Sequence, residues 1–147
     1  MMLSVIIPVY NEVNTIKKLI QKVNNQRKLF SIQIIAVDDY SNDGSFIILK
    51  KFLEQGIINN LIKSKKNEGK GASVLKAKNY IKGDIVLIQD ADLEYDPSDY
   101  KNLLDPILKG KAEVVYGSRT LIKKNRYFSK GFTSIFRIFA NHVLTIF

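Results

Sequence analysis

The order of short apolar runs and helical patterns constrains the fold of this 147-residue chain more than any other feature. Five apolar runs, each about the length of one buried strand, alternate with segments whose apolar residues recur every three or four positions. Strands that alternate with helices are joined by right-handed crossovers, which produce a mostly parallel sheet with helices on its faces. The sequence therefore predicts an α/β fold with strands at 3–9, 32–37, 57–62, 85–89 and 112–116.

Apolar periodicity and helix-end residues place the connecting helices. One-sided apolar stripes predict helices over 13–23, 46–53 and 69–81, and a fourth helix starting at Asp96 and Pro97. Pro106 is expected to bend or end that fourth helix early. The unbroken apolar character of 85–89 indicates a strand that is covered on both faces of the sheet.

Residue composition excludes several classes of site. The chain has no cysteine and one histidine, His142, which leaves no disulfide framework, no thiolate site and little scope for zinc or His-based triads. Met1–Tyr10 lacks the basic residues and the cleavage site of a signal peptide, and no run reaches the roughly 20 apolar residues of a spanning helix. We therefore expect a cytoplasmic protein, with a peripheral membrane contact left open.

The net charge of +9 is concentrated near the C-terminus. Residues 1–118 carry 17 basic and 14 acidic groups (+3), whereas 119–147 carry six basic groups and no acid (+6). We expect 1–118 to form the α/β body, and 119–147 to add a basic, aromatic-rich loop and an amphipathic helix to the same domain. The apolar stripe of that helix either packs on the edge of the sheet or docks, with the neighbouring lysines, on anionic lipid.

Polar residues follow every predicted strand. The strand ends lead into Tyr10–Glu12, Asp38–Asp39, Lys63–Asn67, Asp90–Asp92 and Ser118–Arg119. In an open parallel sheet, ligands bind outside the carboxyl ends of the strands, so these segments are expected to share one cleft. The same acidic strand ends argue against nucleic-acid binding, which the net charge alone would allow.

Two acidic pairs are the strongest chemical candidates, and each has a second interpretation. Asp90 and Asp92 offer hard oxygen ligands to one Mg²⁺ or Mn²⁺ that holds a diphosphate, or they cap the following turn. Asp38–Asp39 either accepts hydrogen bonds from a base or ribose, or belongs to an ordinary turn with the Ser-Asn-Asp-Gly that follows.

Two basic residues could contact phosphate. Gly69–Lys70–Gly71 at a helix start places Lys70 near an anion, or it is a tight turn with close packing. The segment lacks the Gly-x-x-x-x-Gly-Lys-Ser/Thr pattern of a P-loop. Arg119 either clamps a phosphate or is a solvated surface group.

Taken together, five ordered segments resemble glycosyltransferase family 2. The resemblance is closest to the branch of dolichol-phosphate mannosyltransferase and bacterial polyprenyl-phosphate glycosyltransferases, and it covers nearly the whole chain. The segments that carry it are 5–12 (VIIPVYNE), 37–45 (VDDYSNDGS), 67–72 (NEGKGA), 83–97 (GDIVLIQDADLEYDP) and 114–119 (VVYGSR).

The resemblance implies a Rossmann-like GT-A fold and inverting transfer of a sugar from a GDP- or UDP-linked donor, with Mg²⁺ or Mn²⁺. The implied acceptor is a polyprenyl or dolichyl phosphate, or a glycan. Asp92 and Arg119 would be the catalytic residues, and Asp90, Asp92 and, less directly, Glu94 would hold the metal. The implied donor-binding residues are Pro8, Tyr10, Glu12, Val37, Asp39, Asp90, Ala91, Asp92 and Arg119, beside the Lys70 suggested by its helix start.

Two departures from the family pattern matter. Tyr40 is bulkier than the Gly or Ser that often follows the Asp pair. Family members also continue past the Asn-containing helix, matched here by Asn141, into a segment that helps to close the acceptor site. We therefore expect the C-terminal part of the fold to be missing, with a complementing polypeptide as one source of it. The alternative function is a non-catalytic nucleotide-sugar-binding fragment.

Overall fold

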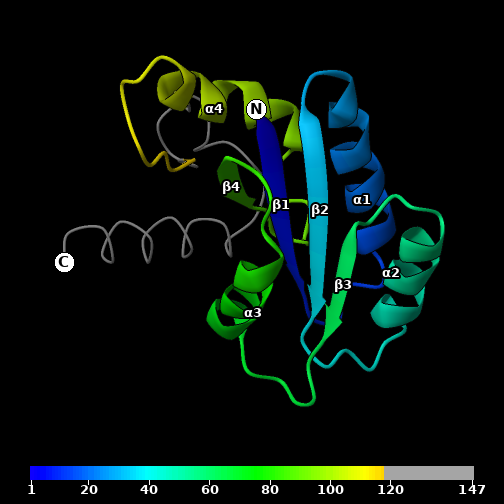
Figure 1. Cartoon of the computed structure of the whole chain (residues 1–147). Coiled ribbons are helices and arrows are strands. Elements are labelled where there is room, and N and C mark those ends of the chain that lie inside the picture. The colour runs from blue at the N-terminus through cyan, green and yellow to red at the C-terminus, as the bar shows by residue number, and fades with distance from the viewer. Residues whose placement is uncertain (118–147) are drawn as a thin grey trace, which may run out of the picture. The chain divides into compact units, whose positions relative to one another are not determined.

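The computed structural model describes residues 1–117, which contain a parallel four-stranded sheet (Figure 1). The strand order is β3-β2-β1-β4, so β1 pairs with both β2 and β4. Leu3 of β1 lies opposite Ile32 of β2 and Ile85 of β4. The strands are β1 (Met2–Val9), β2 (Ser31–Asp38), β3 (Asn60–Lys63) and β4 (Ile85–Ile88). The predicted parallel α/β fold is confirmed.

Helices cover both faces of the sheet. Helices α1 (Ile16–Asn25) and α2 (Ser45–Glu54) and the start of α4 (Tyr100–Leu108) bury side chains in the cluster on one face. Helix α3 (Lys70–Ala77) packs on the other face (Figure 1). Three short 3-10 turns complete the connections, at Gln26–Lys28, Lys78–Tyr80 and Pro97–Asp99.

Side chains of β1 alternate between the two apolar clusters. Leu3, Val5 and Ile7 join the large cluster beneath α1, whereas Ile6 joins a smaller cluster with Ala77 of α3. Successive side chains of a strand point to opposite faces, so a strand covered on both sides needs an unbroken apolar run. Each large apolar side chain buried in this way contributes roughly 1.5–3 kcal/mol.

A buried polar side chain fixes the connection between α3 and β4. The amide of Gln33 donates to Tyr80 O (2.7 Å) and Asn60 Oδ1 (3.0 Å), and it accepts from Ser4 Oγ (2.7 Å) and Lys82 N (2.9 Å). Gly83 then runs so close to β1 that an added Cβ would lie 2.6 Å from Ser4 N. These contacts hold the start of β4 against β1.

The prediction of a fifth strand at 112–116 is wrong. Residues 112–116 form no strand, and Val114 and Tyr116 are 65% and 88% exposed. A strand needs a neighbour that completes its backbone ladder, and the four strands of residues 1–117 leave this segment unpaired. Within these residues β4 is therefore an edge strand. Its Val86 and Ile88 are 45% and 50% exposed on a face that was expected to be covered.

The chain divides into two compact units, residues 1–104 and 105–147. The predicted division at 118/119 remains a prediction. The proposed basic tail, including Arg119, Asn141, His142 and the amphipathic stripe, lies outside the described residues. Helix α4 continues two residues beyond Pro106, which was expected to bend it or end it early. No helix within residues 1–117 combines the length and the apolar character needed to cross a bilayer.

Candidate functional site

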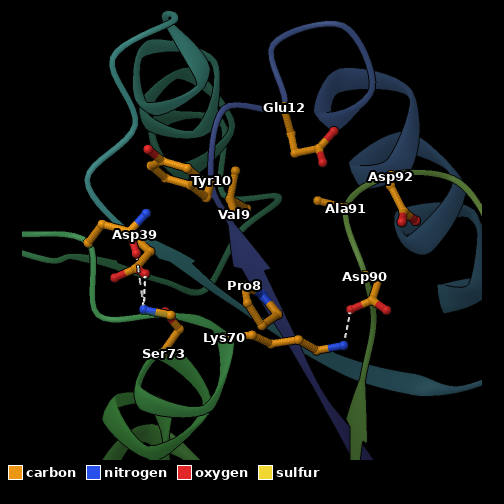
Figure 2. Close-up of a pocket in the computed structure, with 12 residues that line it drawn as sticks. Pro8, Val9, Tyr10, Glu12, Asp39, Lys70, Ser73, Asp90, Ala91 and Asp92 are labelled. Carbon is orange, nitrogen blue, oxygen red and sulfur yellow. Dashed lines mark hydrogen bonds and ion pairs between the residues drawn. The ribbon is translucent and has the colours of Figure 1, made fainter. Parts of the chain in front are cut away.

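A cavity of about 340 Å³ lies at the carboxyl ends of β1, β2 and β4, where the sequence predicted a cleft (Figure 2). Asp90 and Asp92 stand on one side of it, Asp39 and Ser73 on the other, and the end of β1 lies between them. The lining contains eight of the predicted site residues: Pro8, Tyr10, Glu12, Asp39, Lys70, Asp90, Ala91 and Asp92. One edge of the sheet therefore collects residues that are far apart in the sequence.

The loops after β1 and β2 are tied together by side-chain to backbone hydrogen bonds. Ser45 Oγ accepts from Glu12 N (2.8 Å), and Asp43 Oδ2 accepts from Val13 N (2.9 Å). Burial alone would raise the pKa of Asp43, but hydrogen bonds from the Ser45 side chain and from the backbone of Ser45 and Val13 lower it overall. These bonds hold Tyr10 and Glu12 at the cavity, where Tyr10 is 48% exposed.

Asp39 is a buried carboxylate that organises the loop before α3. Its Oδ2 accepts from Gly69 N (2.6 Å) and Glu68 N (3.0 Å). Gly69 has a φ of +86°, a conformation that disfavours a side chain, so the loop can present both N–H groups to one carboxylate. Asp39 therefore joins β2 to the start of α3 and still lines the cavity.

The loop after β4 carries the two aspartates of the Asp-x-Asp segment. Asp92 Oδ1 accepts from Glu94 N (3.0 Å), and Asp90 forms an ion pair with Lys70 of α3. Leu93 has a φ of +63°, which is costly for a bulky residue. The other described non-glycine residues with positive φ are Asn11 and Tyr40, so each loop that follows β1, β2 or β4 contains one. Such backbone strain is typical of functional loops.

A buried amide joins the two ends of the Asp90–Tyr95 loop. Gln89 Nε2 donates to Asp90 O (3.0 Å) and Tyr95 O (3.2 Å), and Gln89 Oε1 accepts from the Tyr100 hydroxyl (3.0 Å). Burial raises the pKa of Tyr100 far above its ordinary value, so its hydroxyl stays protonated and can donate. Gln89 and Tyr100 thus form a buried hydrogen-bonded pair that holds the loop carrying Asp90 and Asp92.

The carboxylates at the cavity supply some, but not all, of the ligands of a hard divalent cation. Asp90 and Asp92 line the same cavity, and their carboxylate oxygens are ligands that Mg²⁺ and Mn²⁺ prefer. Among residues 1–117, no three His, Cys, Asp or Glu residues are grouped closely enough to hold an ion by themselves. Water molecules and the phosphate groups of a bound substrate commonly supply the remaining ligands of Mg²⁺. Glu94 does not line the cavity, and its role as a ligand stays a prediction.

The structure adds lining residues that the sequence did not single out. Val9, Asn67, Gly69 and Ser73 complete the wall. Asn67 and Gly69 belong to the NEGKGA segment that also supplies Lys70. Ser73 is fully buried, and its Oγ has no hydrogen-bond partner within the described residues. Val37, predicted for the nucleoside pocket, lies in the smaller apolar cluster and not in the cavity lining.

A family model described as glycosyl transferase family 2 matches residues 4–144. The chain belongs to this family. The membership agrees with the parallel GT-A type sheet and with the cavity at its carboxyl edge, and it confirms the resemblance drawn from the five segments.

Two curated relatives show how much of the length of similar proteins this chain covers. The chain is 29% identical to dolichol-phosphate mannosyltransferase of Pyrococcus furiosus over 81% of its own length and 33% of the relative's. It is 28% identical to the undecaprenyl-phosphate 4-deoxy-4-formamido-L-arabinose transferase of Salmonella choleraesuis, over 97% of its length and 42% of the relative's. The chain thus spans a third to two fifths of these two relatives.

A solved structure supports the fold. The mannosyltransferase PcManGT of Pyrobaculum calidifontis, in complex with GDP-Man and Mn²⁺, superposes with a TM-score of 0.54 at 26% identity. The match covers 61% of this chain and 27% of that one. A glycosyltransferase with this fold is therefore known in complex with a nucleotide sugar and a divalent cation.

Proposed function

We propose that the described residues bind a nucleoside diphosphate sugar together with Mg²⁺ or Mn²⁺, as the donor site of an inverting glycosyltransferase. The single observation that carries the proposal is the cavity at the carboxyl edge of the sheet. It brings an exposed aromatic ring, a buried carboxylate, a lysine and the Asp90/Asp92 pair to one place. Binding is proposed for these residues, and sugar transfer for the protein to which they belong.

The nucleoside is proposed to lie between Tyr10 and Asp39. The half-exposed ring of Tyr10 offers a face on which a base can stack. Asp39 keeps oxygen lone pairs beyond its two backbone donors, so it can also accept from the N–H of a base. Glu12 and Pro8 line the same wall and are proposed donor contacts.

The diphosphate is proposed to lie between Lys70 and the Asp90/Asp92 pair. Asp90 and Asp92 would hold the cation, with Glu94 as a further ligand, and the ion neutralises the charge that develops on the leaving diphosphate. Ala91 lies at the cavity between the two aspartates and is proposed to contact the ribose. Arg119 is proposed as a second basic side chain at the donor phosphates.

A polyprenyl phosphate is the proposed acceptor. Both named relatives carry a lipid phosphate in their names, dolichol phosphate in one and undecaprenyl phosphate in the other. A phosphate acceptor is already an anionic nucleophile, so its attack on the sugar needs little help from a general base. A peripheral contact of 119–147 with anionic lipid would bring the donor site near such an acceptor.

Calorimetric titration tests donor binding. UDP-glucose and GDP-mannose are titrated into the 147-residue chain with and without Mn²⁺, and one of them is expected to bind only when Mn²⁺ is present. Asp92→Asn should weaken that binding at least tenfold, because it removes a charged ligand of the ion. Asp99→Asn makes the same charge change at an exposed residue outside the cavity, and should leave binding unchanged. Lack of metal-dependent binding to the wild-type chain would refute the proposal.

A further inference from the structure

The charge of the cavity lining is opposite to that of the whole chain. The twelve lining residues include four acids, Glu12, Asp39, Asp90 and Asp92, and one base, Lys70. Their formal sum is 1 − 4 = −3, whereas the chain carries +9. Like charges repel strongly at short range away from bulk water, so a diphosphate enters this cavity only with compensating cations. Among the described lining residues, Lys70 alone supplies such a charge.

The ammonium of Lys70 is already paired in this structure. Lys70, the first residue of α3, extends past Pro8 toward β4, and its Nζ contacts Asp90 Oδ1 (Figure 2). The Lys70 side chain is 58% exposed and that of Asp90 is 25% exposed. Ion pairs that are open to water are weak and break readily, so this contact can exchange for a better one.

We propose that Lys70 is an exchangeable counterion that couples metal binding to nucleotide binding. Without donor, its ammonium neutralises Asp90 and competes with a divalent cation for that carboxylate. When a nucleoside diphosphate enters, the ammonium moves to the phosphate oxygens and leaves Asp90 available to the ion. This inference rests on the proposed function, because it assigns Lys70 a specific part in binding the donor and the metal.

Physical chemistry favours this exchange over a fixed contact. An ammonium at Asp90 Oδ1 occupies the oxygen that would coordinate the metal ion, and it repels a dication held within a few ångströms. Lysine carries a compact charge on a flexible four-carbon stem, so its Nζ can move between neighbouring anions while its backbone stays in α3. Linkage then requires reciprocity: the factor by which nucleotide strengthens metal binding equals the factor by which metal strengthens nucleotide binding.

A static salt bridge is the competing interpretation. In that case the Lys70–Asp90 pair would only join α3 to the loop after β4. Removing the ammonium would then loosen that loop and weaken metal binding, both alone and with nucleotide. The two interpretations therefore predict opposite signs for the effect of a Lys70 substitution on the affinity for metal alone.

Titrations of Mn²⁺, followed by the electron paramagnetic resonance signal of the free ion, distinguish these signs. The wild-type chain, Lys70→Met, Lys70→Arg and Lys66→Met are titrated alone and with saturating UDP or GDP. Lys66→Met is the matched control, because it removes the same charge from an exposed residue four positions away that does not line the cavity. Circular dichroism spectra establish that each variant is folded.

Lys70→Met should bind Mn²⁺ alone about two- to fivefold more tightly than the wild type, the factor expected for removing a solvent-open ion pair. The nucleotide should then strengthen its Mn²⁺ binding by a smaller factor than in the wild type. Lys66→Met and the charge-conserving Lys70→Arg should resemble the wild type in both measurements.

Two results would overturn the inference, and they show whether the proposed function fails with it. If Lys70→Met binds Mn²⁺ alone no more tightly than the wild type and Lys66→Met, the exchange is refuted while metal-dependent nucleotide binding stands. If neither UDP nor GDP strengthens Mn²⁺ binding to the wild type, the proposed function fails, and the inference fails with it.

Discussion

The hydrogen bond between Gln89 and Tyr100 can be tested quantitatively, through the unfolding free energy that is lost when it is removed. Gln89 and Tyr100 are 3% and 1% exposed, so water cannot easily replace a partner that is removed. Tyr100→Phe deletes the hydroxyl that donates to Gln89 Oε1 and leaves a buried acceptor unpaired. Such a loss costs about 1–3 kcal/mol of unfolding free energy. For a chain of this length, each kcal/mol lowers the melting temperature by about 2–4 °C.

The reciprocal change removes the amide. Gln89→Leu leaves the buried Tyr100 hydroxyl without its Gln89 partner and also removes the amide hydrogen bonds to Asp90 O and Tyr95 O, so it should cost at least as much as Tyr100→Phe. The double variant removes both partners of the side-chain bond together. Its cost should therefore fall below the sum of the single costs by about 1 kcal/mol, the usual net value of one hydrogen bond.

Urea unfolding followed by circular dichroism measures these costs for the wild type, both single variants and the double variant. Tyr80→Phe is the control, because it removes the same hydroxyl from a residue that is 44% exposed, and should change stability by less than about 0.5 kcal/mol. Mn²⁺ affinity in the presence of nucleotide reports on the loop separately and should fall in Gln89→Leu. Strict additivity of the two single costs would refute the bond between Gln89 and Tyr100.

Three further predictions concern the body of the fold. Gln33→Leu should cost about 2–3 kcal/mol in urea unfolding, because Ser4 and Tyr80 O lose a buried partner, whereas exposed Gln21→Leu should cost little. Gly83→Ala should destabilise the chain by about 1–3 kcal/mol through contact with the β1 backbone, and Gly71→Ala, which has open space in a helix, should stabilise it by about 0.5–1 kcal/mol. Lys22→Met should raise the pKa of Asp96 from about 2 toward 3.8, because the Lys22 hydrogen bond is the main cause that lowers it. Since that folded pKa lies below the unfolded value, the pair stabilises the folded state fully above about pH 4 and progressively less as the pH falls to 2. NMR titration of the Asp96 carboxyl in the wild type and the variant measures the two pKa values.

Local apolar patterns predicted the centre of the sheet and failed where apolar residues serve another purpose. Strands β1 and β2 were predicted to within one residue at each end, because both are buried on two faces. The strand predicted at 57–62 begins at Asn60 instead. Ile57 and Ile58 donate backbone hydrogen bonds to Phe52 O and pack beneath the end of α2, after Gly56 with a φ of +69°. Apolar residues after a helix-ending glycine commonly close the helix in this way.

The candidate site was predictable where chemistry and chain order coincide. Tyr10, Asp39, Asp90 and Asp92 were found because each follows a strand, and parallel strands bring their carboxyl ends together. Ser73 was not found, because nothing in the sequence shows which face of a short helix meets a cavity. The Lys70–Asp90 and Gln89–Tyr100 contacts depend on side-chain rotamers and on the packing of two elements, which no spacing rule specifies.

The net charge of the chain and the charge of the cavity lining favour different kinds of ligand. A charge of +9 suggests attraction to polyanions in general, yet the excess lies mainly in 119–147, and the cavity lining sums to −3. A cavity of that sign cannot select a diphosphate by bulk electrostatics, because its own carboxylates repel the ligand. Under the proposed function, selection comes from a few cations near the phosphates, which are Lys70 in the described residues and the divalent ion proposed at Asp90 and Asp92. The Asp90/Asp92 pair is therefore proposed to favour donor binding through the cations that it holds, and this is why Lys70→Met is expected to bind Mn²⁺ alone more tightly while nucleotide strengthens that binding by a smaller factor.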